Sequence, residues 1–286
     1  MIDMPKQYAI ISLEKAVKPT YNPNVVAADI DYSVSAPNRC IDMLLAKFQK
    51  QSYTSEVIIK ACPEWKVPRL EKKLCEAKIA LVTDGGLVPK GNPDNLTPTN
   101  ASKFCTYFID GEKTLTAEKY EISHQGYNNR FVLEDPNRLL PVDVLRDLEQ
   151  EGVIGSLSNC FYSTAGVMTP VEKSIEFGKQ IAACLKRDCA DAVILSSTCG
   201  TSTRCGAYIV REIESMGIPV THVTNLTKIA EGIGSSRILC GNSICHVFGD
   251  PSLSPEAERA YRRRLVERAL HLLEKLPDPD SSLVIF

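Results

Sequence analysis

The sequence predicts an α/β protein with a mainly parallel sheet and helices on both of its faces, as in Rossmann-like, doubly wound folds. Short apolar runs at 77–83, 192–197 and 218–223 have the length and composition of buried strands. Stretches with helical periodicity alternate with the later strands, and the connections between them are short. Such alternation is typical of parallel sheets whose crossovers are helices.

The N-terminal residues 1–75 are expected to form an irregular segment outside this sheet. Five prolines lie between residues 19 and 68, and the helical pattern there is confined to a stretch near 38–50. The catalytic α/β domain is then expected to occupy residues 76–286. Its first strand ends at Asp84, where two following glycines indicate a tight loop.

Residues 84–138 are rich in glycine, proline and asparagine, and we expect a long loop excursion there. Loops of this length are uncommon unless they take part in binding or catalysis. Beyond this stretch, a capping box at 169–172 predicts the start of one helix and Gly217 the end of another.

The elements expected after residue 138 alternate between helices and strands. They are a helix at 141–151, a strand at 159–163, a helix after residue 169, the strand at 192–197, a helix at about 203–216, the strand at 218–223 and a final helix from residue 254.

The composition excludes several classes of function. The formal net charge is -2 and the apolar content is 44%, so neither a nucleic-acid partner nor a membrane partner is expected. No apolar stretch approaches the roughly 20 residues of a membrane span, and the first residues lack the pattern of a signal peptide. We therefore expect a cytoplasmic protein whose 11 cysteines are mostly free thiols.

Ligands of parallel α/β sheets bind beyond the carboxyl ends of the strands, which directs attention to the loops after Thr83 and Ser197. Cys199 lies between a strand and the next helix, where unpaired backbone N–H groups favour a thiolate. Arg204 adds a cation nearby, and Gly200 leaves room for a substrate to approach closely. These features fit a nucleophile, and they fit a small apolar residue at a strand end equally well.

Other candidate groups carry alternatives of their own. The loop 83–86 is either an anion-binding loop or a plain tight turn. His124, in a glycine-containing loop, is either a general acid or base or a packed side chain. Arg204 either clamps a carboxylate or supports the thiolate, and His222 is interpreted as a core histidine. The cysteines and the histidine at 240–246 lack the spacing of a zinc site, so no metal is expected.

The segment 197–206, Ser-Thr-Cys-Gly-Thr-Ser-Thr-Arg-Cys-Gly, resembles the selenocysteine motif of component B of the glycine, sarcosine and betaine reductases. In that family the selenocysteine occupies the position of Cys199. The similarity covers most of residues 75–276, in ungapped blocks that follow the same order. These blocks lie at 80–94, 120–127, 134–138, 141–149, 211–214, 217–220 and 246–267.

The resemblance implies an oxidoreductase that cleaves a C–N bond alpha to a carboxylate, and a similar subunit opens the ring in the related D-proline reductase. A pyruvoyl group on a partner subunit activates the substrate amine, the nucleophile attacks the alpha carbon, and the amine leaves. The carboxymethyl group then passes to a small carrier selenoprotein. A thiol reductant is the alternative to that carrier. The chain itself is expected to bind a small amine or amino acid but no cofactor, and to work as a homo- or hetero-oligomer.

The resemblance and the residue pattern together define the expected site. The catalytic residues are Cys199 as the nucleophile, with Arg204, Cys205 and His124 in support. The expected substrate-binding residues are Thr83, Asp84, Gly85, Gly86, Thr198, Gly200, Thr201, Ser202 and His246.

Three departures from the family pattern bear on this expectation. Cys199 replaces selenocysteine. A selenol is largely ionised at neutral pH, whereas a thiol ionises there only if its surroundings lower its pKa. Ser202 stands where the family has a cysteine, which excludes a disulfide between these two positions and leaves Cys205 as the nearest thiol. The resemblance also implies an N-terminal portion that is shorter than in the full-length family subunit. Two alternative functions follow, a self-contained cysteine-dependent enzyme for desulfurisation or another substitution at carbon, and a non-catalytic binding paralogue.

Overall fold

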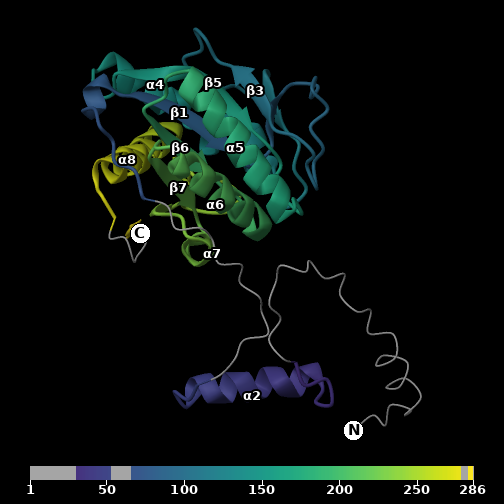
Figure 1. Ribbon diagram of the computed structural model, residues 1–286. Coiled ribbons are helices and arrows are strands. Elements are labelled where there is room, and N and C mark those ends of the chain that lie inside the picture. Colours follow the sequence, from purple (N-terminus) through teal and green to yellow (C-terminus); the bar gives the residue numbers. More distant parts are fainter. Residues whose placement is uncertain (1–29, 53–65, 278–282, 286) are drawn as a thin grey trace. The chain divides into compact units, whose positions relative to one another are not determined.

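A computed structural model describes residues 30–52, 66–277 and 283–285 (Figure 1). The chain divides into two compact units, Met1–Glu64 and Trp65–Phe286. The described part of the first unit contains the helix α2 (Ala36–Phe48), close to the helix expected at 38–50. Much of the segment expected to be irregular, 1–75, lies outside the described residues.

The second unit is built on a seven-stranded sheet in the order β3-β5-β1-β6-β7-β8-β9. Neighbouring strands are parallel except at one edge, where β3 pairs antiparallel with β5. The mainly parallel sheet expected from the sequence is thus confirmed. Its strands are β1 (Lys78–Thr83), β3 (Cys105–Phe108), β5 (Ser156–Ser163), β6 (Ala192–Ser196), β7 (Val220–Thr224), β8 (Arg237–Cys240) and β9 (Leu283–Ile285).

Helices cover both faces of this sheet, as the two sides of β7 illustrate. Thr221 donates a hydrogen bond to the Ala269 carbonyl oxygen of α8 (Pro255–Glu274) at 2.8 Å. The next side chain, His222, points to the opposite face, where it meets Ser197 beside Gly206 of α6 (Gly200–Ser215). On that second face α5 packs along α6 (Figure 1). The other helices are α4 (Val142–Gln150), α5 (Val171–Arg187) and α7 (Thr227–Ile233).

Local signals explain where several helices begin and end. Gly217 follows α6 with φ +87°, a left-handed conformation that glycine adopts without strain. Ser254 caps α8 with its hydroxyl oxygen. The capping box expected at 169–172 is wrong. Thr169 donates its hydroxyl proton to the Ala165 carbonyl oxygen (2.8 Å), so its side chain serves the preceding loop and not α5.

The stretch 84–138, expected as a loop excursion, carries short regular elements. β2 (Leu87–Pro89) and β4 (Tyr120–Ile122) form a separate antiparallel pair, and β3 joins the edge of the main sheet. The helix α3 (Arg130–Glu134) and the 3-10 turn η2 (Pro136–Arg138) follow, and another such turn, η1 (Leu74–Glu76), precedes β1. Elements this short carry no periodic signal. Among the residues that the structure describes, no helix combines the length and the apolarity needed to cross a membrane.

Candidate active site

The carboxyl ends of β1 and β6 are tied together at one edge of the sheet. Thr83 is paired with Ser196 in the parallel register. The Thr83 hydroxyl donates to the Ser196 carbonyl oxygen (3.1 Å) and accepts from the Ser196 hydroxyl (3.0 Å). Both residues are fully buried. Thr83 is therefore a link between strands, and the loops after these two residues leave the sheet next to each other.

Cys199 is the N-cap residue of α6, directly after the loop that leaves β6. The residue is 9% exposed, so its sulfur is largely shielded from water. The Sγ atom lies 3.4 Å from the Ser202 hydroxyl oxygen and 3.7 Å from that of Thr201. The first N–H groups of a helix lack intrahelical partners and carry partial positive charge. A helix end and two hydroxyl groups therefore surround the sulfur.

His124 comes from the stretch between β4 and α3 and contacts one of these hydroxyls. Its Nε2 atom lies 2.7 Å from Ser202 Oγ, which links the imidazole to the sulfur through a single oxygen. The Gly126 backbone N–H donates to Nδ1 (3.0 Å). The residue is 2% exposed, and this burial lowers the pKa of His124 to about 4. The imidazole is therefore neutral at neutral pH.

Two glycines allow this segment to approach the cysteine. A Cβ atom on Gly126 would lie 2.7 Å from the Cys199 sulfur, so only glycine lets the backbone pack against it. Gly86 has φ +73°, and a Cβ atom there would lie 2.2 Å from the Ser123 carbonyl oxygen. The Ser123 N–H donates in turn to the Gly86 carbonyl oxygen (2.8 Å). The glycine turn after β1 thus positions the segment that carries His124.

Tyr127 is a site residue that the sequence reasoning missed. Its hydroxyl donates to the Gly85 carbonyl oxygen (3.0 Å), and its ring packs against that of His124 with the centroids 4.9 Å apart. The tyrosine therefore holds the imidazole against the glycine turn. Tyr127 lies in the block 120–127 together with His124, and this position in the sequence could have indicated it as a site residue.

Asp84 belongs to a buried chain of polar groups next to the cysteine loop. Ser197 Oγ is hydrogen-bonded to Asp84 Oδ2 and lies 2.8 Å from His222 Nε2, and His222 Nδ1 lies 2.8 Å from Ser235 Oγ. All four residues are fully buried. Burial raises the pKa of Asp84 well above its ordinary value and lowers the pKa of His222 to about 3. The uncharged form of both groups is thus favoured, and the interpretation of His222 as a core histidine is confirmed.

Arg204 and Cys205 follow on α6 but have partners other than the sulfur. The Arg204 guanidinium donates to the Thr169 carbonyl oxygen (2.7 Å). Cys205 is fully buried, and this burial raises the pKa of its thiol to about 12. A thiol in that state is a poor nucleophile at neutral pH. The structure therefore places Cys205 in the core and Arg204 at a backbone carbonyl group.

The remaining expected residues are divided between the site and its surroundings. Thr198 is fully buried, and its hydroxyl oxygen has no partner within the described residues. Gly200 is the first residue of α6. The His246 Nδ1 atom lies 2.8 Å from the Gly249 carbonyl oxygen, and the ring packs edge-on against Phe131 of α3. In the parts of the chain that the structure describes, no three histidine, cysteine or carboxylate side chains gather as a metal site would require.

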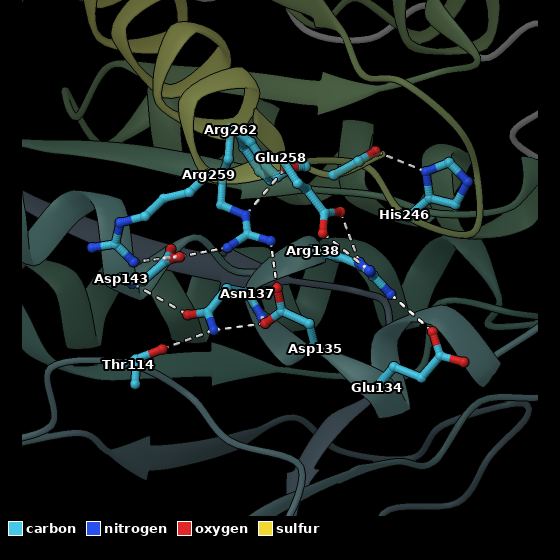
Figure 2. Close-up of polar contacts among 12 residues, drawn as sticks. Thr114, Glu134, Asp135, Asn137, Arg138, Asp143, His246, Glu258, Arg259 and Arg262 are labelled. Carbon is cyan, nitrogen blue, oxygen red and sulfur yellow. Dashed lines mark hydrogen bonds and ion pairs between the residues drawn. The ribbon is translucent and has the colours of Figure 1, made fainter. Parts of the chain in front are cut away.

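A cluster of charged residues frames the loop after β8, and the sequence reasoning missed it (Figure 2). Arg138 donates two hydrogen bonds to the Glu258 carboxylate (2.8 and 3.0 Å), and Arg262 pairs with Asp143. The Phe248 N–H donates to the Arg138 carbonyl oxygen (2.8 Å). α8, the segment before α4 and the loop after β8 are thereby joined. The blocks 134–138 and 246–267 contain most of these residues, but their pairing is a long-range contact.

Comparison with known proteins reveals relatives over most of the chain. The family model described as glycine/sarcosine/betaine reductase selenoprotein B matches residues 5–198, ending one residue before Cys199. The glycine reductase complex component B subunit gamma of Carboxydothermus hydrogenoformans is 46% identical over 235 residues, 82% of this chain and 54% of the relative. The sarcosine reductase complex component B subunit beta of Peptoclostridium acidaminophilum is 41% identical over 243 residues, 85% of this chain and 56% of the relative.

A more distant relative is the D-proline reductase subunit gamma of Acetoanaerobium sticklandii. It is 31% identical over 185 residues, 64% of this chain and 74% of the relative. The chain spans about half the length of the component B relatives that it matches. No solved structure matches it significantly.

Proposed function

This chain belongs to the glycine/sarcosine/betaine reductase selenoprotein B family, and on that premise we propose that it is the thiol subunit of a multi-component reductase. Its part of the reductive cleavage is the substitution that breaks a C–N bond alpha to the carboxylate of an amine or amino acid, and the electrons for the overall reduction come from a thiol reductant that acts on the carrier afterwards. Cys199 is the nucleophile, and a partner subunit with a pyruvoyl group activates the substrate amine.

The observation that carries this proposal is the surroundings of the Cys199 sulfur. It lies at the N-terminus of α6, within 3.4 Å of a hydroxyl group that contacts a neutral imidazole. Three other cysteines, Cys105, Cys160 and Cys240, lie where burial raises the pKa of the thiol. A reactive thiol needs donors that stabilise its thiolate, and the groups at Cys199 that can donate are the start of α6 and the two hydroxyls of Ser202 and Thr201.

In the proposed step, a sulfur electron pair of the Cys199 thiolate forms a C–S bond with the alpha carbon. The electron pair of the C–N bond departs with the nitrogen, which the partner subunit has activated. With glycine, sarcosine or betaine the product on this chain is a carboxymethyl thioether. Transfer of the carboxymethyl group to a thiolate or selenolate of a carrier protein then restores the Cys199 thiolate.

This sequence of steps requires no internal resolving thiol. Ser202 cannot form a disulfide, and Cys205 is fully buried. A transfer to an external carrier returns Cys199 to its starting state without either residue. The absence of a thiol at Ser202 also favours a second candidate, a self-contained cysteine-dependent enzyme that performs another substitution at carbon, such as desulfurisation.

The test combines thiol reactivity with turnover. Alkylation of the full chain by iodoacetamide at pH 7, followed by peptide mass spectrometry, should show Cys199 reacting faster than the exposed Cys75 and Cys189. At least one of glycine, sarcosine and betaine should be turned over, only when a pyruvoyl-bearing subunit and a carrier are added, and Cys199→Ala should abolish this. Turnover by the chain alone would support the self-contained enzyme. Substrate binding with an unreactive Cys199 would identify a binding paralogue.

A further inference from the structure

The Cys199 sulfur has two hydroxyl neighbours, Ser202 Oγ at 3.4 Å and Thr201 Oγ1 at 3.7 Å. A hydroxyl group has one proton and two lone pairs, so it accepts from one partner while donating to another. The bond that each oxygen accepts from its other neighbour therefore decides whether the hydroxyl proton is free to donate to the sulfur once the thiol is ionised.

The oxygen of Ser202 accepts from His124. The Gly126 backbone N–H donates to His124 Nδ1 at 3.0 Å, and a backbone N–H is never an acceptor. Nδ1 therefore carries the lone pair, and the single proton of the neutral ring is on Nε2. Nε2–H donates to Ser202 Oγ (2.7 Å), which leaves the serine O–H free to point at the sulfur.

The oxygen of Thr201 has an equivalent arrangement. The Met168 backbone N–H donates to Thr201 Oγ1 at 3.3 Å. Met168 has φ +59°, a left-handed conformation that residues with a side chain rarely adopt. A strained turn thus directs this N–H at the threonine oxygen, and the threonine O–H is also left free to donate to the sulfur.

We propose that Ser202 and Thr201 are paired hydrogen-bond donors to the Cys199 thiolate, with His124 as a fixed donor behind Ser202 and not as a general acid or base. This deepens, and rests on, the assignment of Cys199 as the nucleophile. In the thiol form, Sγ–H donates to Ser202 Oγ. When that proton is lost to solvent, the hydroxyl groups turn and donate to the sulfur, and such charge-assisted bonds are the stronger ones.

The arrangement stabilises negative charge but delivers no net proton. If Nε2–H of His124 moved to Ser202, the ring would be left as an anion, because Nδ1 faces the Gly126 N–H and has no route to a replacement proton. The proton that the departing nitrogen takes up therefore comes from the substrate, from solvent or from the partner subunit.

The first test measures alkylation of Cys199 by iodoacetamide at pH 7 and at pH 10, where accessible thiols are ionised. The ratio of the two rates cancels differences in access to the sulfur. Removing a hydrogen bond to a charged group corresponds to about a 10- to 100-fold effect. Ser202→Ala should lower the ratio by about that factor, and Thr201→Val by less, because its oxygen is farther away. An unchanged ratio in Ser202→Ala would overturn the proposal.

Two variants of His124 separate a donor from a base. The side-chain amide N–H of glutamine can replace Nε2–H, whereas neither glutamine nor alanine can act as a base. The alkylation ratio of His124→Gln should therefore be several-fold higher than that of His124→Ala. Equal losses in the two variants would assign a base to this position and overturn the donor role.

The tautomer is measured directly in wild-type protein labelled with ¹⁵N-histidine. The ring nitrogen shifts of His124 at pH 7 should report a proton on Nε2, and a proton on Nδ1 would contradict the proposal. All three measurements use the full chain without substrate. If they succeed while reductase turnover fails, the proposed function is refuted and the donor arrangement is not.

Discussion

Asp84→Asn is expected to stabilise the protein increasingly as the pH rises. Asp84 is fully buried, and burial raises the pKa of its carboxyl group well above the ordinary value. Its Oδ1 atom has no hydrogen-bond partner within the described residues. The unfolded chain loses the Asp84 proton above about pH 4, whereas the folded protein retains it. Folding then takes up a proton. The stability that the Asp84 carboxyl group contributes is therefore complete below about pH 4. Above that pH it decreases by about 1.4 kcal/mol per pH unit until the folded protein also loses the proton.

Asparagine has nearly the shape of the protonated carboxyl group and binds no such proton. The free energy of unfolding of Asp84→Asn, relative to wild type, should therefore rise between pH 5 and pH 7, by up to about 3 kcal/mol. For a unit of this size, about 2–4 °C per kcal/mol converts that upper bound to a relative Tm increase of at most roughly 5–11 °C.

The assay is urea denaturation at pH 5, 6 and 7, followed by far-UV circular dichroism. Asp250→Asn is the matched control, since hydrogen bonds from Ser252 lower the pKa of Asp250. That carboxylate is ionised in both folded and unfolded chains over this range, so its stability difference should stay constant with pH. A constant or falling difference for Asp84→Asn would show that Asp84 is ionised in the folded protein and refute the reasoning.

Three further predictions concern packing. Gly126→Ala should slow alkylation of the site cysteine strongly, because the new Cβ would lie 2.7 Å from its sulfur, and an unchanged rate would contradict the close approach. Gly86→Ala should destabilise the protein more than Gly91→Ala in thermal unfolding. Both have φ above +70°, but only the first Cβ meets backbone, at 2.2 Å, and equal losses would speak against this clash. Arg237→Met should lower the free energy of unfolding by about 3–5 kcal/mol, since it removes the guanidinium that lies 2.9 Å from the buried Glu214 carboxylate. If the double variant with Glu214→Leu is no more stable than Arg237→Met, the loss does not come from the buried carboxylate that lost its counter-charge.

The fold was predictable where its signals are local. The apolar run 77–83 became β1, and Gly217 ends α6, because burial of a strand and a left-handed helix end each depend on a few consecutive residues. β8 and β9 escaped prediction, since strands of four and three residues show no clear alternation. Thr169 resembles a helix cap in sequence, yet its hydroxyl bonds to a loop carbonyl that only the folded chain brings within reach.

By itself, the sequence determined that Cys199 stands between a buried strand and a helix, because both elements are encoded by neighbouring residues. Only the tertiary structure decided what surrounds it. His124 reaches Ser202 across 78 positions, and Asp84 reaches Ser197 across 113. These contacts depend on β1 lying beside β6 in the sheet and on glycines that let a loop pack against the sulfur. The order of strands and the packing of loops are properties of the whole chain, so no local pattern records which imidazole meets which hydroxyl group.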